Sequence, residues 1–386
     1  MKNLIVVTLA LVLMGCDQPA YKELPLAQMS NTGEPSLSVA NDGTVTLTYL
    51  QQAQGTATLY LRELRGDQWS APRRIVEGED LLVNWADFPT LIDADNQLTA
   101  QWMIRNPAPG FAYDVYTATS TDDGRTWSTP QRLHADTSAS EHGFVSLYAG
   151  KTGVGAFWLD GQRYAKGDAP DGMELRHKVI GATGPQSEDV VDALVCDCCQ
   201  TDVAMVSGSP MVVYRDRSEG NIRDISIARQ ENGAWVSAPV AQDGWHITGC
   251  PVNGPAIAAE YDVVAVAWFT AVPVDSVRVA FSFDGGRSFA APVDVSQESP
   301  VGRVDLVVDA AGNAIVSWLS PAREGFVYRR VQPSGEMGKI HLVAPMASHR
   351  NAGFPRMVQS NDRLIFAWTD SLADTPTVRA MSMSGR

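Results

Sequence analysis

The sequence predicts an all-β protein, and within that class a β-propeller built from four-stranded blades. No long stretch of the 386 residues has the 3.6-residue apolar period of a helix, and short alternating apolar runs are separated by turn residues. One motif also recurs along the chain: an apolar strand, a tight polar turn, and a second strand that ends in an aromatic residue. Even spacing of such a unit is typical of a ring of blades, because radial repetition protects the edges of the sheets.

The N-terminal residues are expected to form a targeting signal. A short basic start precedes an apolar run over residues 4–14, which is too short to span a bilayer as a helix. The run ends in Leu13-Met14-Gly15-Cys16, which resembles a bacterial lipobox whose cysteine is lipidated. We expect residues 1–15 to be a lipoprotein signal peptide and Cys16 to anchor the chain to the cell envelope, facing the periplasm. Asp17 favours the inner membrane in the enterobacterial pattern.

Residues 16–30 are expected to form the lipidated N-terminus and a closing strand, and residues 31–386 the propeller. Seven copies of the motif start near residues 35, 88, 143, 202, 254, 302 and 354. The seventh copy lacks its last strand, whereas residues 22–27 supply a spare one, so we expect the N-terminal strand to close the ring. Six blades are the alternative count. Two packed β-sandwiches would not explain the even spacing.

Two turns resemble the Asp-box, also known as the bacterial neuraminidase (BNR) repeat. They are formed by Ser120, Asp122, Gly124 and Trp127 in the second copy, and by Ser282, Asp284, Gly286 and Phe289 in the fifth. In such a turn the Asp carboxylate accepts backbone N–H groups, a Gly permits positive φ, and the aromatic ring packs beneath the hairpin. The chain therefore resembles the sialidase-like Asp-box propellers, in which these turns are structural and lie away from the active site.

Unusual side chains gather on the loops of one face, which holds the second-to-third loops and the blade-to-blade crossings. The chain carries 44 acidic and 30 basic residues, which disfavours nucleic acid as a partner. Arginines and tryptophans on this face nevertheless predict a site for a small acidic ligand, a glycan or a protein segment. The expected ligand-binding residues are Trp85, Arg105, Arg163, Arg215, Arg217, Trp245, Arg303 and Arg350.

Two classes of function remain open. The family resemblance implies a glycoside hydrolase of the exo-sialidase type, with Glu141, Asp160 or Asp216 as candidate catalytic carboxyl groups. The early arginine signature of sialidases is absent, and Phe354-Pro355-Arg356-Met357 is scrambled and stands in the last copy. No catalytic residue of the family is therefore transferred. This departure favours a binding or assembly factor, as in Asp-box propellers that assist photosystem assembly.

Four cysteines besides Cys16 lie on two successive crossings of the same face: Cys196, Cys198, Cys199 and Cys250. In an oxidising compartment this number predicts two disulfides, although three pairings are open. A thiolate site for zinc or Cu(I), with His246 or His142 as a further ligand, is one alternative, and a redox-active pair is another. No cofactor is required by the fold.

Overall fold

A computed structural model describes residues 20–27, 30–108, 111–167, 172–181, 187–372 and 374–385. The expected signal peptide, Cys16 and Asp17 lie outside the described residues. No helix within these ranges is both long enough and apolar enough to cross a membrane.

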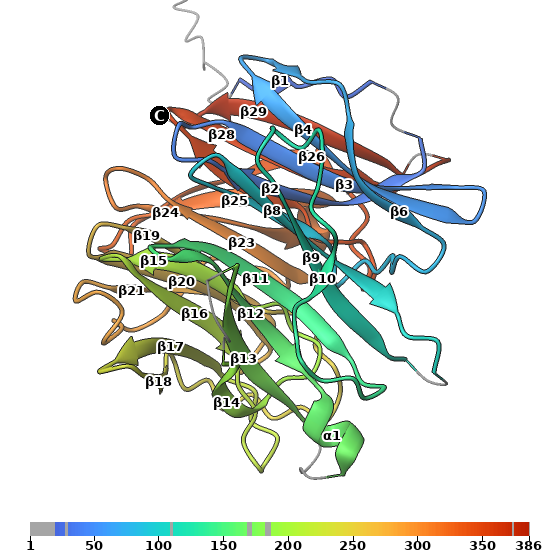
Figure 1. Ribbon diagram of the computed structural model, residues 1–386. Coiled ribbons are helices and arrows are strands. Elements are labelled where there is room, and N and C mark those ends of the chain that lie inside the picture. The colour runs from blue at the N-terminus through green and yellow to red at the C-terminus, as the bar shows by residue number, and fades with distance from the viewer. Residues whose placement is uncertain are drawn as a thin grey trace, which may run out of the picture.

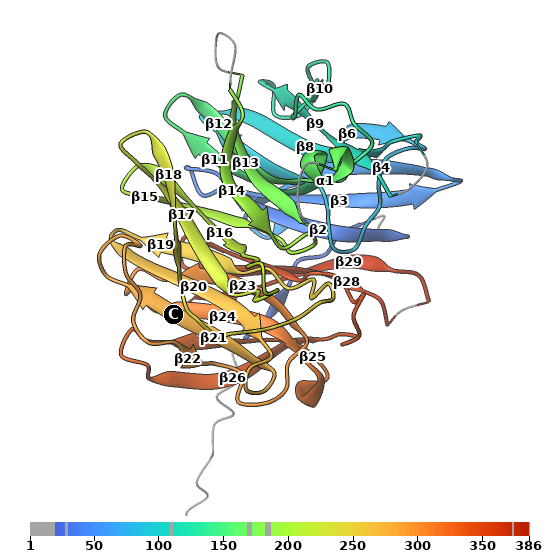
Figure 2. The same cartoon turned by 90° about the horizontal axis from the view of Figure 1, so that it is seen from below.

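The described chain forms seven antiparallel sheets arranged around one axis (Figures 1 and 2). The strands of the first three blades are β2 (Thr32–Val39), β3 (Val45–Ala53), β4 (Thr56–Arg65), β5 (Gln68–Trp69) and β6 (Arg73–Gly78); β7 (Thr90–Ala94), β8 (Gln97–Arg105), β9 (Tyr113–Ser120) and β10 (Gln131–Arg132); β11 (His142–Gly150), β12 (Gly153–Asp160), β13 (Met173–Ile180) and β14 (Asp189–Val195).

Blades four to six continue the same order. Their strands are β15 (Asp202–Val206), β16 (Ser209–Arg215), β17 (Ile225–Glu231) and β18 (Ala234–Pro239); β19 (Ala256–Glu260), β20 (Val263–Thr270), β21 (Ser276–Ser282) and β22 (Val293–Asp294); β23 (Gly302–Val308), β24 (Ala314–Ser320), β25 (Gly325–Val331) and β26 (Met337–Pro345). Helical structure in the described chain is limited to α1 (Gln162–Lys166) and a 3₁₀ turn at Pro321–Arg323.

The seventh blade joins the two ends of the chain. It consists of β27 (Arg356–Ser360), β28 (Arg363–Asp370), β29 (Thr377–Ser384) and the N-terminal β1 (Lys22–Glu23), which lies beside β29 in Figure 1. The first strands of all seven blades contact one another in a closed cycle. Seven blades and closure of the ring by the N-terminal strand are thus confirmed.

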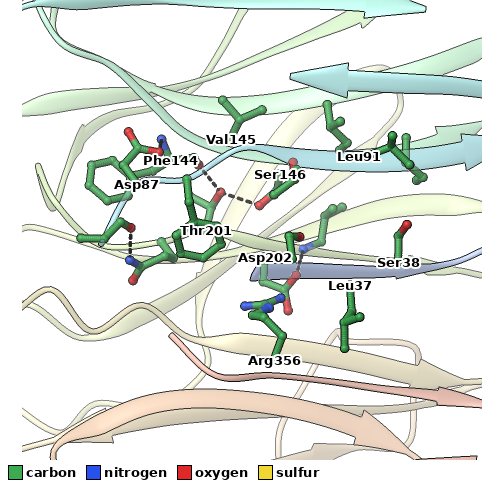
Figure 3. Close-up of a pocket in the computed structure, with 18 residues that line it drawn as sticks. Leu37, Ser38, Asp87, Leu91, Phe144, Val145, Ser146, Thr201, Asp202 and Arg356 are labelled. Carbon is green, nitrogen blue, oxygen red and sulfur yellow. Dashed lines mark hydrogen bonds between the residues drawn. The ribbon is translucent and has the colours of Figure 1, made fainter. Parts of the chain in front are cut away.

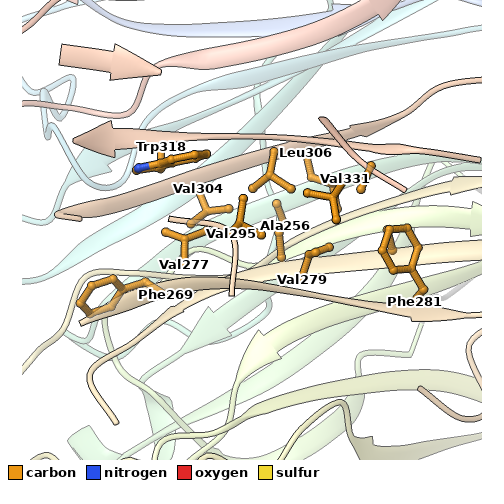
Figure 4. Close-up of a cluster of buried hydrophobic side chains, with 14 of the residues drawn as sticks. Ala256, Phe269, Val277, Val279, Phe281, Val295, Val304, Leu306, Trp318 and Val331 are labelled. Carbon is orange, nitrogen blue, oxygen red and sulfur yellow. The ribbon is translucent and has the colours of Figure 1, made fainter. Parts of the chain in front are cut away.

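The core lies between neighbouring blades. Figure 4 shows one such layer, in which Val277 and Val279 of blade 5 pack against Leu306 and Trp318 of blade 6. Trp102, Trp158, Trp268 and Trp318 stand near the ends of second strands, and each is at most 1% exposed. The repeated aromatic position is therefore a core position, where a large ring fills the wedge between two blades.

The two turns that resemble Asp-boxes are closed by their own aspartates. Asp122 Oδ1 accepts the backbone N–H groups of Arg125 (3.1 Å) and Thr126 (2.9 Å). Asp284 Oδ1 does the same with Arg287 (3.0 Å) and Ser288 (2.9 Å). These bonds stay within each turn, as expected for a structural loop.

Candidate functional site

A pocket of about 510 Å³ opens on the loop-bearing face, among the connections of blades 2, 3 and 4. We call it the mouth pocket, and α1 marks its side of the molecule in Figure 1. Its polar or aromatic lining residues are Phe111, Ser140, Glu141, Tyr164, Asp197, Arg217, Arg223, Thr248 and Cys250. Of the residues proposed from the sequence, the pocket brings together Glu141, Arg217 and Cys250.

Glu141 stands immediately before β11, and its carbonyl accepts the backbone N–H of Gly161 at 2.9 Å. This bond ties the crossing into blade 3 to the loop that carries α1. Burial and, to a smaller extent, the nearby carboxylates of Asp87 and Asp197 together raise the pKa of the Glu141 carboxyl to about 7. Glu141 therefore retains a proton to about neutral pH and can donate a hydrogen bond there.

A second carboxylate in the pocket is held in an ion pair. Arg217 Nη1 lies 3.2 Å and 3.3 Å from the two carboxylate oxygens of Asp197, and its Nε donates to Asn221 Oδ1 at 3.1 Å. The Asp197 side chain is 43% exposed, whereas that of Arg217 is 13% exposed. The pocket thus contains one carboxyl group with a raised pKa and one carboxylate held in an ion pair.

Arg223 is the unusual basic residue of the pocket. It is 2% exposed, and its Nε and Nη1 have no hydrogen-bond partner among the described residues. Its backbone is fixed, because its N–H donates to the Trp245 carbonyl at 2.8 Å and its carbonyl accepts from Arg215 Nη1 at 2.6 Å. A buried guanidinium without a partner is costly, so this group is suited to an anion that enters the pocket.

Two aromatic side chains stand at the rim. Phe111 is 62% exposed and Tyr164 is 59% exposed, and both line the pocket. Exposed rings beside a polar pocket can cover the apolar face of a ligand. Phe111, Tyr164, Asp197 and Arg223 were not singled out from the sequence. Asp197 stands between Cys196 and Cys198 on a crossing that the sequence did single out, and no such signal pointed to the other three residues.

Sulfur atoms lie beside the mouth pocket. Cys198 and Cys250 form a disulfide that joins two successive crossings, and Cys250 lines the pocket. Cys196 and Cys199 are unpaired thiols, each 1% exposed, with their sulfurs 2.8 Å apart. Of the two expected disulfides the structure therefore contains one, and Cys196 and Cys199 are adjacent free thiols. The sulfurs of Cys196, Cys198 and Cys199 lie within 4.8 Å of one another and fit a soft metal ion only if that disulfide is reduced.

His246 is exposed and does not belong to this sulfur group. His142, the other expected ligand, belongs with His134 and Asp114 to a buried cluster between blades 2 and 3. The two imidazole rings are parallel, with centroids 3.6 Å apart and an interplanar angle of 1°. Lone pairs in parallel planes do not converge on one ion at the usual 2.0–2.1 Å, so this cluster is a poor metal site.

Arg215 and Arg303 are buried and donate hydrogen bonds to backbone carbonyls. The Arg215 guanidinium, 1% exposed, donates to the backbone carbonyls of Asn253 (2.8 Å), Arg223 (2.6 Å) and Phe269 (2.7 Å). Arg303, 2% exposed, donates to the carbonyls of Val252 and Arg350. These hydrogen bonds to backbone carbonyls hold the crossings in place, and the expected role of the two arginines in ligand binding stays a prediction.

Two of the three candidate carboxyl groups also lie elsewhere. Asp160 is 1% exposed and accepts hydrogen bonds from Trp158 Nε1 (2.8 Å) and the Gln162 N–H (2.9 Å). Asp216 accepts the Arg217 N–H at 2.7 Å and the Ser226 hydroxyl at 3.2 Å, and burial raises its pKa. Neither lines the mouth pocket. These bonds fix the loop backbone, which leaves Glu141 as the candidate that faces the pocket.

The remaining expected ligand residues are dispersed. Trp245 is 7% exposed beneath the Arg215 guanidinium, and Trp85 stacks on Phe354. The three other arginines have partners of their own, namely Glu174 for Arg163 (2.9 Å), the Leu81 carbonyl for Arg105 (3.3 Å) and the Cys250 carbonyl for Arg350 (2.9 Å). Their expected role in ligand binding stays a prediction.

A narrower cavity of about 170 Å³ runs along the axis, lined by the first strands (Figure 3). Figure 3 shows Asp202 and Arg356 facing each other there. Asp202 Oδ2 accepts the Ile257 N–H at 2.8 Å, and Thr201 Oγ1 donates to the Phe144 carbonyl at 2.9 Å. These contacts join neighbouring blades. The polar residues that line the axial cavity therefore hold neighbouring blades together. The cavity is also smaller than the mouth pocket.

No protein-family model matches the sequence, and no curated protein matches it. Solved structures do resemble the fold. An α-L-arabinanase from Penicillium chrysogenum, solved with arabinobiose, matches with a TM-score of 0.51 and 14% identity, covering 95% of this chain and 98% of that one. An α-L-arabinofuranosidase of Fusarium graminearum, also solved with arabinobiose, matches with a TM-score of 0.55 and 12% identity. The match covers 95% of this chain and 97% of that one. This chain shares their fold.

The NanB sialidase of Streptococcus pneumoniae matches more loosely, with a TM-score of 0.46 and 9% identity over 92% of this chain and 69% of that one. At such identities a shared propeller says nothing about a shared activity, because propellers carry many functions on one architecture. The comparisons therefore establish the fold, and the site must be interpreted from its own residues.

Proposed function

We propose that the mouth pocket binds a saccharide that carries a carboxylate. The observation that carries this proposal is Arg223, a guanidinium that is 2% exposed, lines the pocket and has two nitrogens without a partner among the described residues. A carboxylate fits such a group because it can accept two parallel N–H bonds from a guanidinium. The chain is acidic overall, so a buried basic group without a partner in this pocket is a specific indication of an anionic ligand.

Further features favour a sugar over a bare anion. Phe111 and Tyr164 offer exposed rings at the rim, and Glu141 and Asp197 supply a donor and an acceptor for hydroxyl groups. A volume of about 510 Å³ accommodates a mono- or disaccharide. Two neighbours in fold were solved with arabinobiose, which supports a carbohydrate as the class of ligand.

Calorimetry on the full-length protein tests this proposal. Digalacturonic acid and sialyllactose serve as acidic probes, and arabinobiose serves as a neutral probe. We expect an acidic probe to bind, and R223M to weaken its binding at least tenfold, equivalent to about 1.4 kcal/mol. R74M is the matched control, because Arg74 is an exposed arginine that lies outside the pocket lining. Equal affinity of R223M and the parent protein would contradict the role of Arg223.

Hydrolysis of a glycosidic bond is a second candidate function. Glycosidases use one carboxyl group that stays protonated and a second that is ionised, and the pocket holds Glu141 with its pKa raised to about 7 beside the ion-paired Asp197. Glu141 would protonate the leaving oxygen in such a reaction. Incubation with nitrophenyl arabinofuranosides, uronides and sialosides tests it, and any turnover should disappear in E141Q. Binding without turnover would leave the pocket as a binding site alone.

We also propose that the chain is a lipid-anchored protein of the bacterial envelope that faces the periplasm. The support is the lipobox-like ending at Cys16 after an apolar run, with Asp17 favouring the inner membrane. Metabolic labelling with a radioactive fatty acid tests this proposal. We expect label in the parent protein and none in C16A, and label retained in C16A would contradict it.

A further inference from the structure

Four sulfur atoms meet at the inner edge of the mouth pocket in two different states. Cys198 and Cys250 are joined in a disulfide, and Cys250 is exposed and lines the pocket. Cys196 and Cys199 are free thiols with sulfurs 2.8 Å apart, each 1% exposed. The dithiol itself is therefore shielded from solvent, whereas one end of the disulfide is accessible.

The buried thiols can reach the disulfide. The sulfurs of Cys196, Cys198 and Cys199 all lie within 4.8 Å of one another, so a small movement brings Cys196 Sγ onto Cys198 Sγ. Thiol–disulfide exchange needs a thiolate that attacks one sulfur and a leaving thiolate at the other. Here the leaving sulfur is that of Cys250, at the pocket.

The surroundings of Cys196 favour its thiolate. Burial alone would raise the pKa of the Cys196 thiol, but the hydrogen bond with Cys199, the Cys198 N–H and the guanidinium groups of Arg215 and Arg223 outweigh burial and lower that pKa. The pKa of Cys199 is raised by burial and by the contact with Cys196. Cys196 is therefore the nucleophile of the pair, and Cys199 is the thiol that follows it.

We propose that these four cysteines form a thiol–disulfide relay, which carries two electrons from the buried Cys196/Cys199 dithiol to a disulfide-bearing substrate at the mouth pocket. The relay does not depend on the saccharide proposed above. It would instead give the pocket a redox activity toward a low-molecular-weight or peptide disulfide.

The steps balance in atoms and electrons. The Cys196 thiolate attacks Cys198 Sγ, which forms a Cys196–Cys198 disulfide and releases the Cys250 thiolate. That thiolate attacks the external disulfide RSSR, which gives a Cys250–SR mixed disulfide and RS⁻. Cys199 then attacks Cys196 and releases the Cys198 thiolate, which attacks Cys250 and releases the second RS⁻. In sum, two thiols and RSSR become a Cys196–Cys199 disulfide and two RSH, and the Cys198–Cys250 disulfide is restored.

Trapping with oxidised glutathione tests the relay in the full-length protein. Samples are quenched with acid at intervals, alkylated with N-ethylmaleimide and mapped by peptide mass spectrometry, with the Cys16 peptide followed separately. We expect a glutathione adduct on Cys250 to appear before the Cys196 and Cys199 thiols are lost, and a Cys196–Cys199 disulfide at the end.

Two variants separate the steps. C196S should show no adduct on Cys250, because the disulfide has lost its internal nucleophile. C199S should accumulate the adduct at least tenfold over the parent protein, because nothing resolves the Cys196–Cys198 disulfide. Both variants keep Cys198 and Cys250, and circular dichroism checks that they fold. The wild-type order of events tests the relay even if a variant fails to fold.

Three results would overturn the relay. One is an adduct on Cys250 in C196S at the wild-type rate. Another is a Cys196–Cys199 disulfide in the native protein that reduced glutathione cannot open. The third is a metal ion retained by the cysteines in native mass spectrometry and lost on denaturation, which would make the sulfurs a metal site instead.

Discussion

Glu141 combines burial with two neighbouring carboxylates, Asp87 and Asp197, and each of these factors favours its protonated form. Asp87 is itself buried, and burial raises its pKa to about 7. Charge on this side of the pocket therefore changes within the physiological range of pH. Arg217 and Arg223, on the loop between β16 and β17, line the same pocket as Glu141.

Binding of an acidic saccharide should depend on pH through Glu141. Because the pKa of Glu141 is raised to about 7, the group is neutral below that pH and negative above it. We expect affinity for a carboxylate-bearing probe to fall as the pH rises from 6 to 8, by calorimetry at constant ionic strength. E141Q should flatten this dependence while retaining binding at pH 6. An unchanged profile in E141Q would assign the titration to another group.

Arg215 is a buried arginine whose side chain holds backbone segments together. Its fork of donors reaches three carbonyls on separate segments and also lies over the Trp245 ring at 4.7 Å. A lysine has one compact ammonium and cannot reproduce this fork. R215K should therefore lower the free energy of unfolding by about 2–3 kcal/mol, measured with urea. R350K is the control, since Arg350 is exposed, and an unchanged midpoint for R215K would contradict the structural role.

At the scale of elements, neighbouring blades are joined by aspartates at their first strands. Asp87 accepts the Phe144 N–H (2.9 Å), Asp202 accepts the Ile257 N–H (2.8 Å) and Asp305 accepts the Met357 N–H (2.7 Å). These three residues belong to blades 2, 4 and 6, and each reaches the next blade. Polar contacts along the axis thus supplement the apolar layers between the sheets.

The turns closed by Asp122 and Asp284 predict an acid-sensitive contribution to stability. The Ser288 hydroxyl and N–H lower the pKa of Asp284, and the corresponding Thr126 groups lower that of Asp122 to about 2. A lowered folded-state pKa stabilises the fold above the ordinary value near 3.8, and this contribution is lost as the pH falls toward 2.

Replacement of Asp284 should therefore matter more at neutral than at acid pH. We expect D284A to lower the melting temperature at pH 7 and the difference from the parent protein to shrink as the pH approaches 2. Differential scanning calorimetry at several pH values measures this. The exposed D275A is the control and should differ little from the parent at any pH. A constant deficit across the pH range would exclude the charge of Asp284 as the cause.

At the scale of the whole molecule, the ring is closed by a very short strand. Lys22 and Glu23 pair with Ser382 and Met381, and the Leu24 N–H donates to the Ala380 carbonyl at 3.0 Å. Leu24 is 1% exposed and packs in the cluster shared by blades 7 and 1. One buried leucine therefore holds the N-terminal segment to the last blade.

Truncation of that leucine should weaken the closure. We expect L24A to lower the free energy of unfolding by about 2–3 kcal/mol, because it leaves a cavity between the first and last blades. Guanidinium unfolding measures the change, and limited proteolysis should release the N-terminal segment earlier than in the parent protein. E23A, at an exposed position of the same strand, is the control. Equal stability of L24A and E23A would show that closure does not depend on this contact.

The sequence by itself determined the fold to the level of blade number. Turn chemistry and strand alternation are local, so each blade can be identified within a stretch of about fifty residues. The seventh copy lacks a strand and residues 22–27 offer a spare one, which together predict how the ring closes. The loop-bearing face and the proximity of the cysteines followed from the same topology.

Only the tertiary structure decided which of those loop residues form a pocket. Arg215 ends β16 and Arg223 lies in the loop that follows it, yet Arg215 donates to three backbone carbonyls whereas two nitrogens of Arg223 have no partner among the described residues. Phe111, on the loop between β8 and β9, and Glu141, on the crossing into blade 3, line the same pocket. Hydrogen-bond partners across blades depend on the packing of segments far apart in sequence, and local patterns do not encode that packing.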